Sequence, residues 1–304
     1  MAKNIKQKNR STVIAVIAAI IICALVFCSA CSQNDDNQIS IDEHYGSEVH
    51  TTEEIKLFFE QGLTDKVVLC ADIDIGNDIL NLSEERKQIT VEGNGFTLKG
   101  SSDCVIRLEN NTSLVLNDIT VTGECDVIGC MENAELSGKG AVISAHMFGV
   151  RCGKKLTIGE NSGITVKSSD GNGIMARTIY IEENAKLSAR AKLSALQVLR
   201  EELVIGVNSS VDAVTESDYS AVKCTGTLVL NDGAVFTVKN EDSYHGAQAD
   251  YIVVGNDVTI NADGGDKGAG IFLFQLEDDI EVSGHCSPPL RKENGNGSIK
   301  FKGE

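Results

Sequence analysis

Tryptophan is absent from this chain of 304 residues, and its only two prolines are adjacent, at Pro288 and Pro289. Asn-Gly pairs, which close two-residue β-hairpins, are sparse. Valine, isoleucine and threonine occur throughout, together with 29 glycines. This composition favours many strands and few helices. Because hairpin turns are scarce, we expect a β protein that is not assembled from antiparallel hairpins.

Positive charge is also scarce. Lysine and arginine number 27 against 44 aspartates and glutamates, which gives a net charge of -17. Four of the basic residues lie within the first thirty positions, where there is no acidic residue. Because phosphate binding requires a positive field, nucleic acid is excluded as a partner.

The ten cysteines do not form a recognisable framework. Three of them, Cys23, Cys28 and Cys31, lie in the N-terminal segment, and the other seven are odd in number and have no Cys-X-X-Cys spacing. Neither a zinc site nor a complete set of disulfides is predicted from this pattern. We expect no metal and no cofactor. Cys130 and Cys152 are predicted to be buried thiols on neighbouring repeats.

The N-terminal segment has the layout of an export signal. Residues 1–12 are polar and basic, residues 13–27 are apolar, and the small residues Ser29 and Ala30 follow. This apolar run is shorter than the roughly 20 residues that a membrane-spanning helix needs. A plain secretory signal and a retained membrane anchor are the alternatives to a lipoprotein signal.

Ser29, Ala30 and Cys31 resemble the lipobox of bacterial lipoproteins, with Cys28 at the position where leucine is usual. The resemblance implies cleavage before Cys31, attachment of lipid to that cysteine, and export to the outer face of the membrane in the cell envelope. The membrane would then be a partner through the lipid anchor.

Residues 33–50 carry five acidic residues and no lysine or arginine, which indicates a solvated tether. Next, Thr51 and Glu54 have the spacing of a helix capping box, and Gly62 can end the helix. The apolar stripe of this helix consists of Ile55, Phe58 and Phe59. The predicted organisation is residues 1–30 as signal peptide, 31–50 as tether, 51–63 as capping helix and 64–304 as a repeat domain.

A repeat of about 23 residues fills the rest of the chain. An apolar, mostly polar, apolar triplet recurs ten times at steps of 22 to 25 residues, starting at positions 73, 96, 119, 141, 164, 187, 211, 236, 258 and 280. Two further apolar units, such as VIRL at 105 and LVL at 114, recur in step with it. Each period therefore holds three short strands, and the coiled chain can stack every strand on its counterpart one period later.

These repeats resemble the right-handed parallel β-helix of the pectate-lyase-like superfamily. The resemblance implies about ten coils with three short strands per coil and an N-terminal helix cap. The resemblance is specific for the fold but weak for activity, because no catalytic motif of that superfamily can be matched residue by residue.

The best candidate site lies in two loops. Tyr219 and Tyr244 occupy nearly equivalent loop positions on consecutive coils, beside Asp218, Asp242 and His245. Aromatic faces can stack on sugar rings, and these polar groups can bind sugar hydroxyls, so the five residues are candidate glycan-binding residues. The alternative is a pair of solvated loop tyrosines.

The predicted function is therefore that of a lipid-anchored surface β-helix protein that binds carbohydrate or mediates adhesion without catalysis. Similar exported solenoids act as adhesins and glycan-associated proteins, so this expectation rests on resemblance. A polysaccharide lyase or glycoside hydrolase is the second hypothesis, for which Arg107, Arg151 and Lys223 share an outward strand position. A purely structural spacer is the third.

Overall fold

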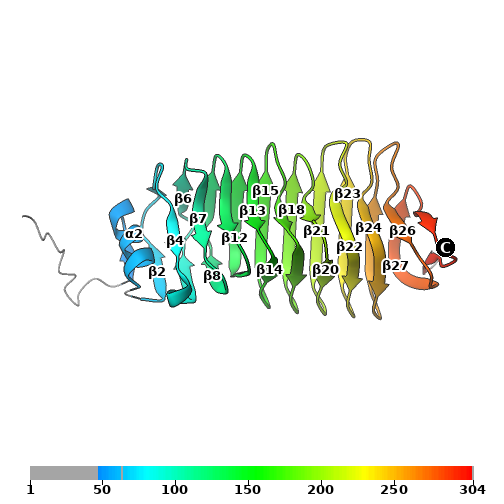
Figure 1. The fold of residues 1–304 in the computed structure, drawn as a ribbon, viewed down its shortest axis with the longest axis horizontal. Helices are drawn as coiled ribbons and strands as arrows, with labels where there is room; N and C mark the ends of the chain where they lie inside the picture. The colour runs from blue at the N-terminus through cyan, green and yellow to red at the C-terminus, as the bar shows by residue number, and fades with distance from the viewer. Residues whose placement is uncertain (1–46, 63, 303–304) are drawn as a thin grey trace, which may run out of the picture. The chain divides into compact units, whose positions relative to one another are not determined.

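The 23-residue repeat folds into the coils of a parallel β-helix, which stack along the long axis of Figure 1. The computed structural model describes residues 47–62 and 64–302. Strands of successive coils pair in parallel, and the stacking distance of paired strands is about 4.8 Å. The prediction of an all-β solenoid with about ten coils and three strands per coil is confirmed.

One face of the solenoid is an 11-stranded sheet built from the recurring triplets. Its strands are β3 (Ile73–Asp74), β6 (Thr97–Gly100), β9 (Thr120–Gly123), β12 (Lys139–Ala145), β15 (Gly163–Ser168), β18 (Lys186–Ala191), β21 (Ser210–Thr215), β23 (Val235–Asn240), β25 (Thr259–Asp263), β27 (Ile280–Ser287) and β29 (Ile299–Phe301).

The other two faces form one 18-stranded sheet. One of them contains β4 (Leu80–Leu82), β7 (Cys104–Leu108), β10 (Asp126–Cys130), β13 (Phe148–Cys152), β16 (Ile174–Ala176), β19 (Leu196–Val198), β26 (Ile271–Gln275) and β28 (Arg291–Asn294). The other contains β1 (Glu48–Val49), β2 (Lys66–Leu69), β5 (Gln88–Glu92), β8 (Thr112–Asn117), β11 (Ala134–Ser137), β14 (Lys155–Ile158), β17 (Thr178–Ile181) and β20 (Glu202–Ile205). The long strands β22 (Val222–Leu230) and β24 (Ala247–Val254) run through both faces and join them.

The core is a set of aliphatic columns inside the coils. Ile164, Leu187 and Val211 lie opposite one another on β15, β18 and β21, and all three are buried. Burying a side chain of this kind stabilises the fold by about 1.5–3 kcal/mol. Cys130 and Cys152 face each other on β10 and β13 in the same way, as buried thiols that form no disulfide.

Asparagines make the bend that follows the strands β14, β17 and β20. Asn161, Asn184 and Asn208 have φ values of 56°, 57° and 54°, which lie in the left-handed region that asparagine tolerates. The backbone N–H of Asn161 donates to Glu183 O of the next coil at 3.0 Å. The same bend is thus repeated from one coil to the next.

Helix α2 (Thr52–Gln61) covers the N-terminal end, as predicted. Thr51 accepts from the N–H of Glu54, the Glu54 carboxylate accepts from the N–H of Thr51, and Gly62 ends the helix with φ 65°. Its buried residues are Ile55, Phe58 and Phe59. Lys56 of the same helix forms an ion pair with Asp78 of the first coil at 2.9 Å. The helix therefore shields the open end of the solenoid from edge pairing.

The solenoid begins earlier than the sequence indicated. Strand β1 lies within the range 31–50 that was assigned to the tether, and it pairs with β2. Val49 has no solvent-exposed surface, so this single apolar residue anchors the strand to the core. The predicted signal peptide, Cys31 and most of the tether lie outside the described residues.

Candidate functional site

One edge of the solenoid is formed by the segments that connect the 11-stranded sheet to the next strand of each coil. We call it the loop edge and define it by residues 146–147, 169–173, 192–195, 216–221, 241–246 and 264–270. The connections are short near the middle of the solenoid and longer toward its C-terminal end. All the residues predicted to bind glycan lie on this edge.

Buried polar residues at the ends of the strands hold these loops. Ser168 donates to Met147 O of the preceding coil at 2.6 Å, and Thr215 donates to Lys192 O at 3.3 Å. Asn240 donates to Tyr219 O at 2.6 Å. Since each buried side chain binds the loop of the coil before it, the loops are tied to one another along the axis, and a buried group left without its partner would cost about 1–3 kcal/mol.

A groove of about 570 Å³ lies where the loops are short. Its floor follows one outward column of the 11-stranded sheet, Ser144, Lys167 and Arg190, which are paired on successive coils. His146 and Lys192 stand on its loop side. The groove therefore gathers two lysines, one arginine and one histidine in a protein of net charge -17.

Arg190 ties the groove to the next two coils. Its Nη2 atom donates to Glu216 Oε1 and to Glu241 Oε2, at 2.6 Å each. These bonds, first of all that to Glu216, raise the pKa of Arg190. Glu216 is the only carboxylate among the groove-lining residues, and it is held by this arginine.

Lys167 and Lys192 are in a different situation. Both are exposed, and within the part of the chain that the structure describes neither takes part in an ion pair. They therefore present unneutralised ammonium groups to anything in the groove. An anion bound there would gain their attraction without breaking an existing contact.

The two predicted tyrosines are exposed just beyond the groove. Tyr219 is 48% exposed and Tyr244 is 40% exposed, on the loops that follow Glu216 and Glu241. The loop of Tyr244 is fixed by the next coil, because the N–H of Gly265 donates to Tyr244 O at 2.7 Å. A Cβ at Gly265 would lie 2.2 Å from Asp242 O, so only glycine permits this approach.

The three predicted polar partners have different environments. The Asp218 carboxylate accepts a hydrogen bond from the Ser243 hydroxyl and so joins the two tyrosine loops. Asp242 is exposed, and its N–H donates to Asn240 Oδ1 at 2.8 Å. His245, by contrast, is only 8% exposed and lies within the wall.

His245 supports the loop from beneath. Its Nδ1 accepts from the N–H of Ala269 at 2.9 Å, so the ring is neutral and carries its proton on Nε2. Burial, followed by the charge of Arg291, lowers the pKa of His245. The Tyr244 ring packs against this imidazole with centroids 4.4 Å apart. His245 therefore positions Tyr244 and does not face solvent.

The outward residues of the second hypothesis are separated along their face. Arg107 and Arg151 are paired with Gly129 between them, so they stand two coils apart. Arg151 lies 3.8 Å from Asp126, whose pKa is raised by burial. The charge of Asp103 also raises the pKa of Asp126, so a second carboxyl group lies near this pair.

No family model, no curated protein sequence and no solved structure matches this chain significantly. Among the described residues, no helix combines the length and apolar character needed to span a membrane.

Proposed function

We propose that this protein is a lipid-anchored surface lipoprotein whose pectate-lyase-like β-helix binds an acidic polysaccharide without cleaving it. The observation that carries the proposal is the groove, where Lys167 and Lys192 lie unpaired next to Arg190 on a protein that is otherwise strongly acidic. Lipid on Cys31 would place the groove at the outer face of the membrane.

The direction of the groove supports a linear ligand. Lys167 and Arg190 occupy the same strand position on adjacent coils, so their backbones are about 4.8 Å apart along the axis. Beyond Arg190 the same edge continues to the loops of Tyr219 and Tyr244. A polyanionic chain laid along the axis would meet cations first and aromatic faces next, and sugar rings can stack on the latter.

The lining supports binding and not hydrolysis. A glycoside hydrolase needs two carboxyl groups on either side of the scissile bond. The groove contains only Glu216, and the Arg190 guanidinium holds this carboxylate. A polysaccharide lyase would also need cations that bind the carboxylate of a uronic acid. A lyase therefore remains the second candidate function.

The test is binding of the full chain, solubilised in detergent, to acidic polysaccharides such as polygalacturonate, alginate and hyaluronan, with neutral dextran as reference. Lys167→Ala combined with Lys192→Ala is expected to weaken binding about 10-fold, because two exposed ion contacts of up to about 1 kcal/mol each together contribute roughly 1.4 kcal/mol. Added salt is expected to weaken binding by the unmodified chain.

The matched control is Lys139→Ala combined with Lys186→Ala. These two lysines are exposed on the same sheet, at the opposite ends of their strands from the groove, so the net charge changes equally. Equal loss of binding in both double variants would refute the groove as the binding site. Release of unsaturated uronate ends from the polysaccharide would show that the protein is a lyase and not a binding module. Cys31→Ala is expected to release the protein from membranes, and retention on membranes would refute lipidation at this residue.

A further inference from the structure

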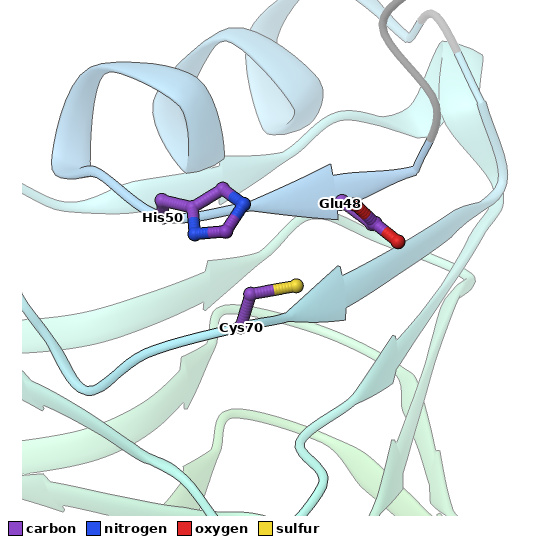
Figure 2. Close-up of side chains that lie close together, drawn as sticks. All are labelled: Glu48, His50 and Cys70. Carbon is purple, nitrogen blue, oxygen red and sulfur yellow. The ribbon is translucent and has the colours of Figure 1, made fainter.

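A group of potential metal ligands lies at the N-terminal end of the solenoid, away from the loop edge. Glu48 and His50 come from β1 and the residue that follows it, and Cys70 comes directly after β2 (Figure 2). One ligand atom of each residue lies within 4.8 Å of the other two. Among the described residues this is the only such group of three.

Strand register explains how the three side chains meet. Glu48 pairs with Val68 and Val49 pairs with Leu69, so His50 stands next to Cys70. Because side chains alternate along a strand, the buried Val49 lies between Glu48 and His50, which both point outward. Figure 2 shows Glu48 on one strand with His50 directly after it, and Cys70 directly after the neighbouring strand.

The backbone of this group is fixed, whereas its side chains are available. The N–H of His50 donates to Glu54 Oε2 at 2.7 Å, which links the group to the cap of α2, and the N–H of Cys70 donates to Val49 O at 2.9 Å. No hydrogen bond or ion pair within the described residues engages the Glu48 carboxylate or the His50 ring. The Cys70 thiol has one long contact, 3.9 Å to Val68 O.

We propose that Glu48, His50 and Cys70 bind a Zn²⁺ ion. A thiolate and an imidazole together favour zinc over calcium or magnesium, and a carboxylate oxygen is an accepted third ligand. The thiolate and the carboxylate balance the two positive charges of the ion. Three protein ligands leave the fourth tetrahedral position for water or for a donor group of another molecule.

The geometry requires only small side-chain movements. Metal–ligand bonds of about 2.0–2.3 Å in a tetrahedron separate the ligand atoms by roughly 3.3–3.8 Å. Rotation of the exposed Glu48 and His50 side chains can close the atoms from within 4.8 Å to this separation. The bound ion would cross-link β1 to β2, that is, the short first strand to the next coil, and stabilise the folded state by mass action.

The test is titration of the full chain, in detergent and with reductant, with Co²⁺ as a spectroscopic substitute for zinc. One equivalent is expected to produce thiolate-to-cobalt charge-transfer absorption and the visible bands of tetrahedral cobalt. Zn²⁺ is expected to abolish both signals, while Ca²⁺ and Mg²⁺ leave them unchanged. The N-terminal cysteines stay present in every variant, so their own contribution cancels in the comparison.

Cys70→Ser and His50→Ala are each expected to weaken this binding more than about 100-fold, since even the partners of metal ligands contribute about 10–100-fold. Cys125→Ser is the matched control for the thiol, because Cys125 is also partly exposed, and His285→Ala is the control for the exposed imidazole. His50 is exposed, so its variant keeps the fold and the test remains valid if Cys70→Ser does not fold.

A second measurement is the melting temperature. Zn²⁺ is expected to raise it in the unmodified chain and in both controls, but not in His50→Ala. The proposal is overturned if the unmodified chain and His50→Ala bind the same number of cobalt ions with the same spectrum, or if zinc raises the melting temperature of both equally.

Discussion

The imidazole of His245 is stacked on the phenyl ring of Phe272 of the next coil, with centroids 4.8 Å apart and planes inclined by 19°. The Phe272 ring packs edge to face against Phe274, with centroids 5.3 Å apart. At the other end of this row, the Tyr244 ring packs against His245. Such contacts contribute about 0.5–1.5 kcal/mol beyond burial. An exposed tyrosine is thus supported by a row of rings that includes the buried His245.

The stability of the tyrosine loops is expected to fall in mild acid. Burial holds the pKa of His245 below its ordinary value of 6.5, so the neutral ring stabilises the fold fully above pH 6.5. That stability is lost as the pH falls through the folded-state pKa, because protonation removes the Nδ1 acceptor of Ala269 N–H. Melting temperatures between about pH 7.5 and pH 5 test this expectation.

In that experiment His245→Gln is expected to depend less on pH than the unmodified chain. His146→Gln, which changes an exposed ring on the same edge, is expected to keep the original dependence. Parallel pH curves for the unmodified chain and His245→Gln would contradict the assignment of the neutral ring.

The Asn240 side chain is expected to hold the Tyr219 loop. Asn240→Ala removes the hydrogen bonds to Tyr219 O and Ser217 O and the acceptor for Asp242 N–H. Loss of these partly buried hydrogen bonds should destabilise the fold by about 1–3 kcal/mol. Urea unfolding measures this loss. Val235→Ala, at an exposed position of the same strand, should change stability by less than about 0.5 kcal/mol.

Cys152 is expected to resist alkylation in the folded protein. The hydrogen bond with Cys130, together with burial, raises the pKa of the Cys152 thiol, and only the thiolate reacts rapidly. Cys125 is partly exposed and should be labelled before Cys152. Mass spectrometry after a short iodoacetamide pulse, with and without denaturant, distinguishes the sites. Rapid labelling of Cys152 without denaturant would show that this column is open to solvent.

The N-terminal cap is expected to protect the end of the solenoid. Thr51→Ala removes the acceptor for Glu54 N–H and should cost about 1 kcal/mol. Since α2 shields the first coil, the variant should also aggregate at lower temperature than the unmodified chain. Thr165→Ala, at an outward position in the middle of the solenoid, is the control. Light scattering during heating measures the temperature at which aggregation begins. The same onset temperature for Thr51→Ala and the unmodified chain would show that the cap does not protect the end of the solenoid.

The repeat predicted the fold because every coil places its buried apolar residues at nearly the same spacing along the chain. Ile164, Leu187 and Val211 needed only their 23- to 24-residue steps to be placed in one column. The helix cap could also be predicted, because Thr51 and Glu54 are three residues apart and form the capping box within one turn. The end of the tether was misplaced because β1 has one buried residue, Val49, and one apolar residue carries no periodicity.

The sites were less predictable, because they depend on which unlike residues become neighbours. Ser144, Lys167 and Arg190 follow the repeat at steps of 23 residues, but their chemistry differs, so only stacking reveals a groove. His50 and Cys70 are 20 residues apart and match no metal motif. The burial of His245 depends on the path of residues 264–270, which local sequence does not determine.

The ion pair between Arg190 and Glu216 is expected to limit the affinity of the groove for polyanions. Glu216→Gln removes the only carboxylate of the lining and leaves Arg190 with Glu241 alone, so binding of an acidic polysaccharide should strengthen several-fold. Stability should change by less than about 1 kcal/mol, because both side chains are half exposed. Glu183→Gln, an exposed glutamate on a different turn, makes the same change in net charge and should leave affinity almost unaltered. Isothermal titration calorimetry at low and high salt separates the effect of the groove charges from that of the net charge. Equal gains in affinity for both variants would mean that only the net charge of the protein matters.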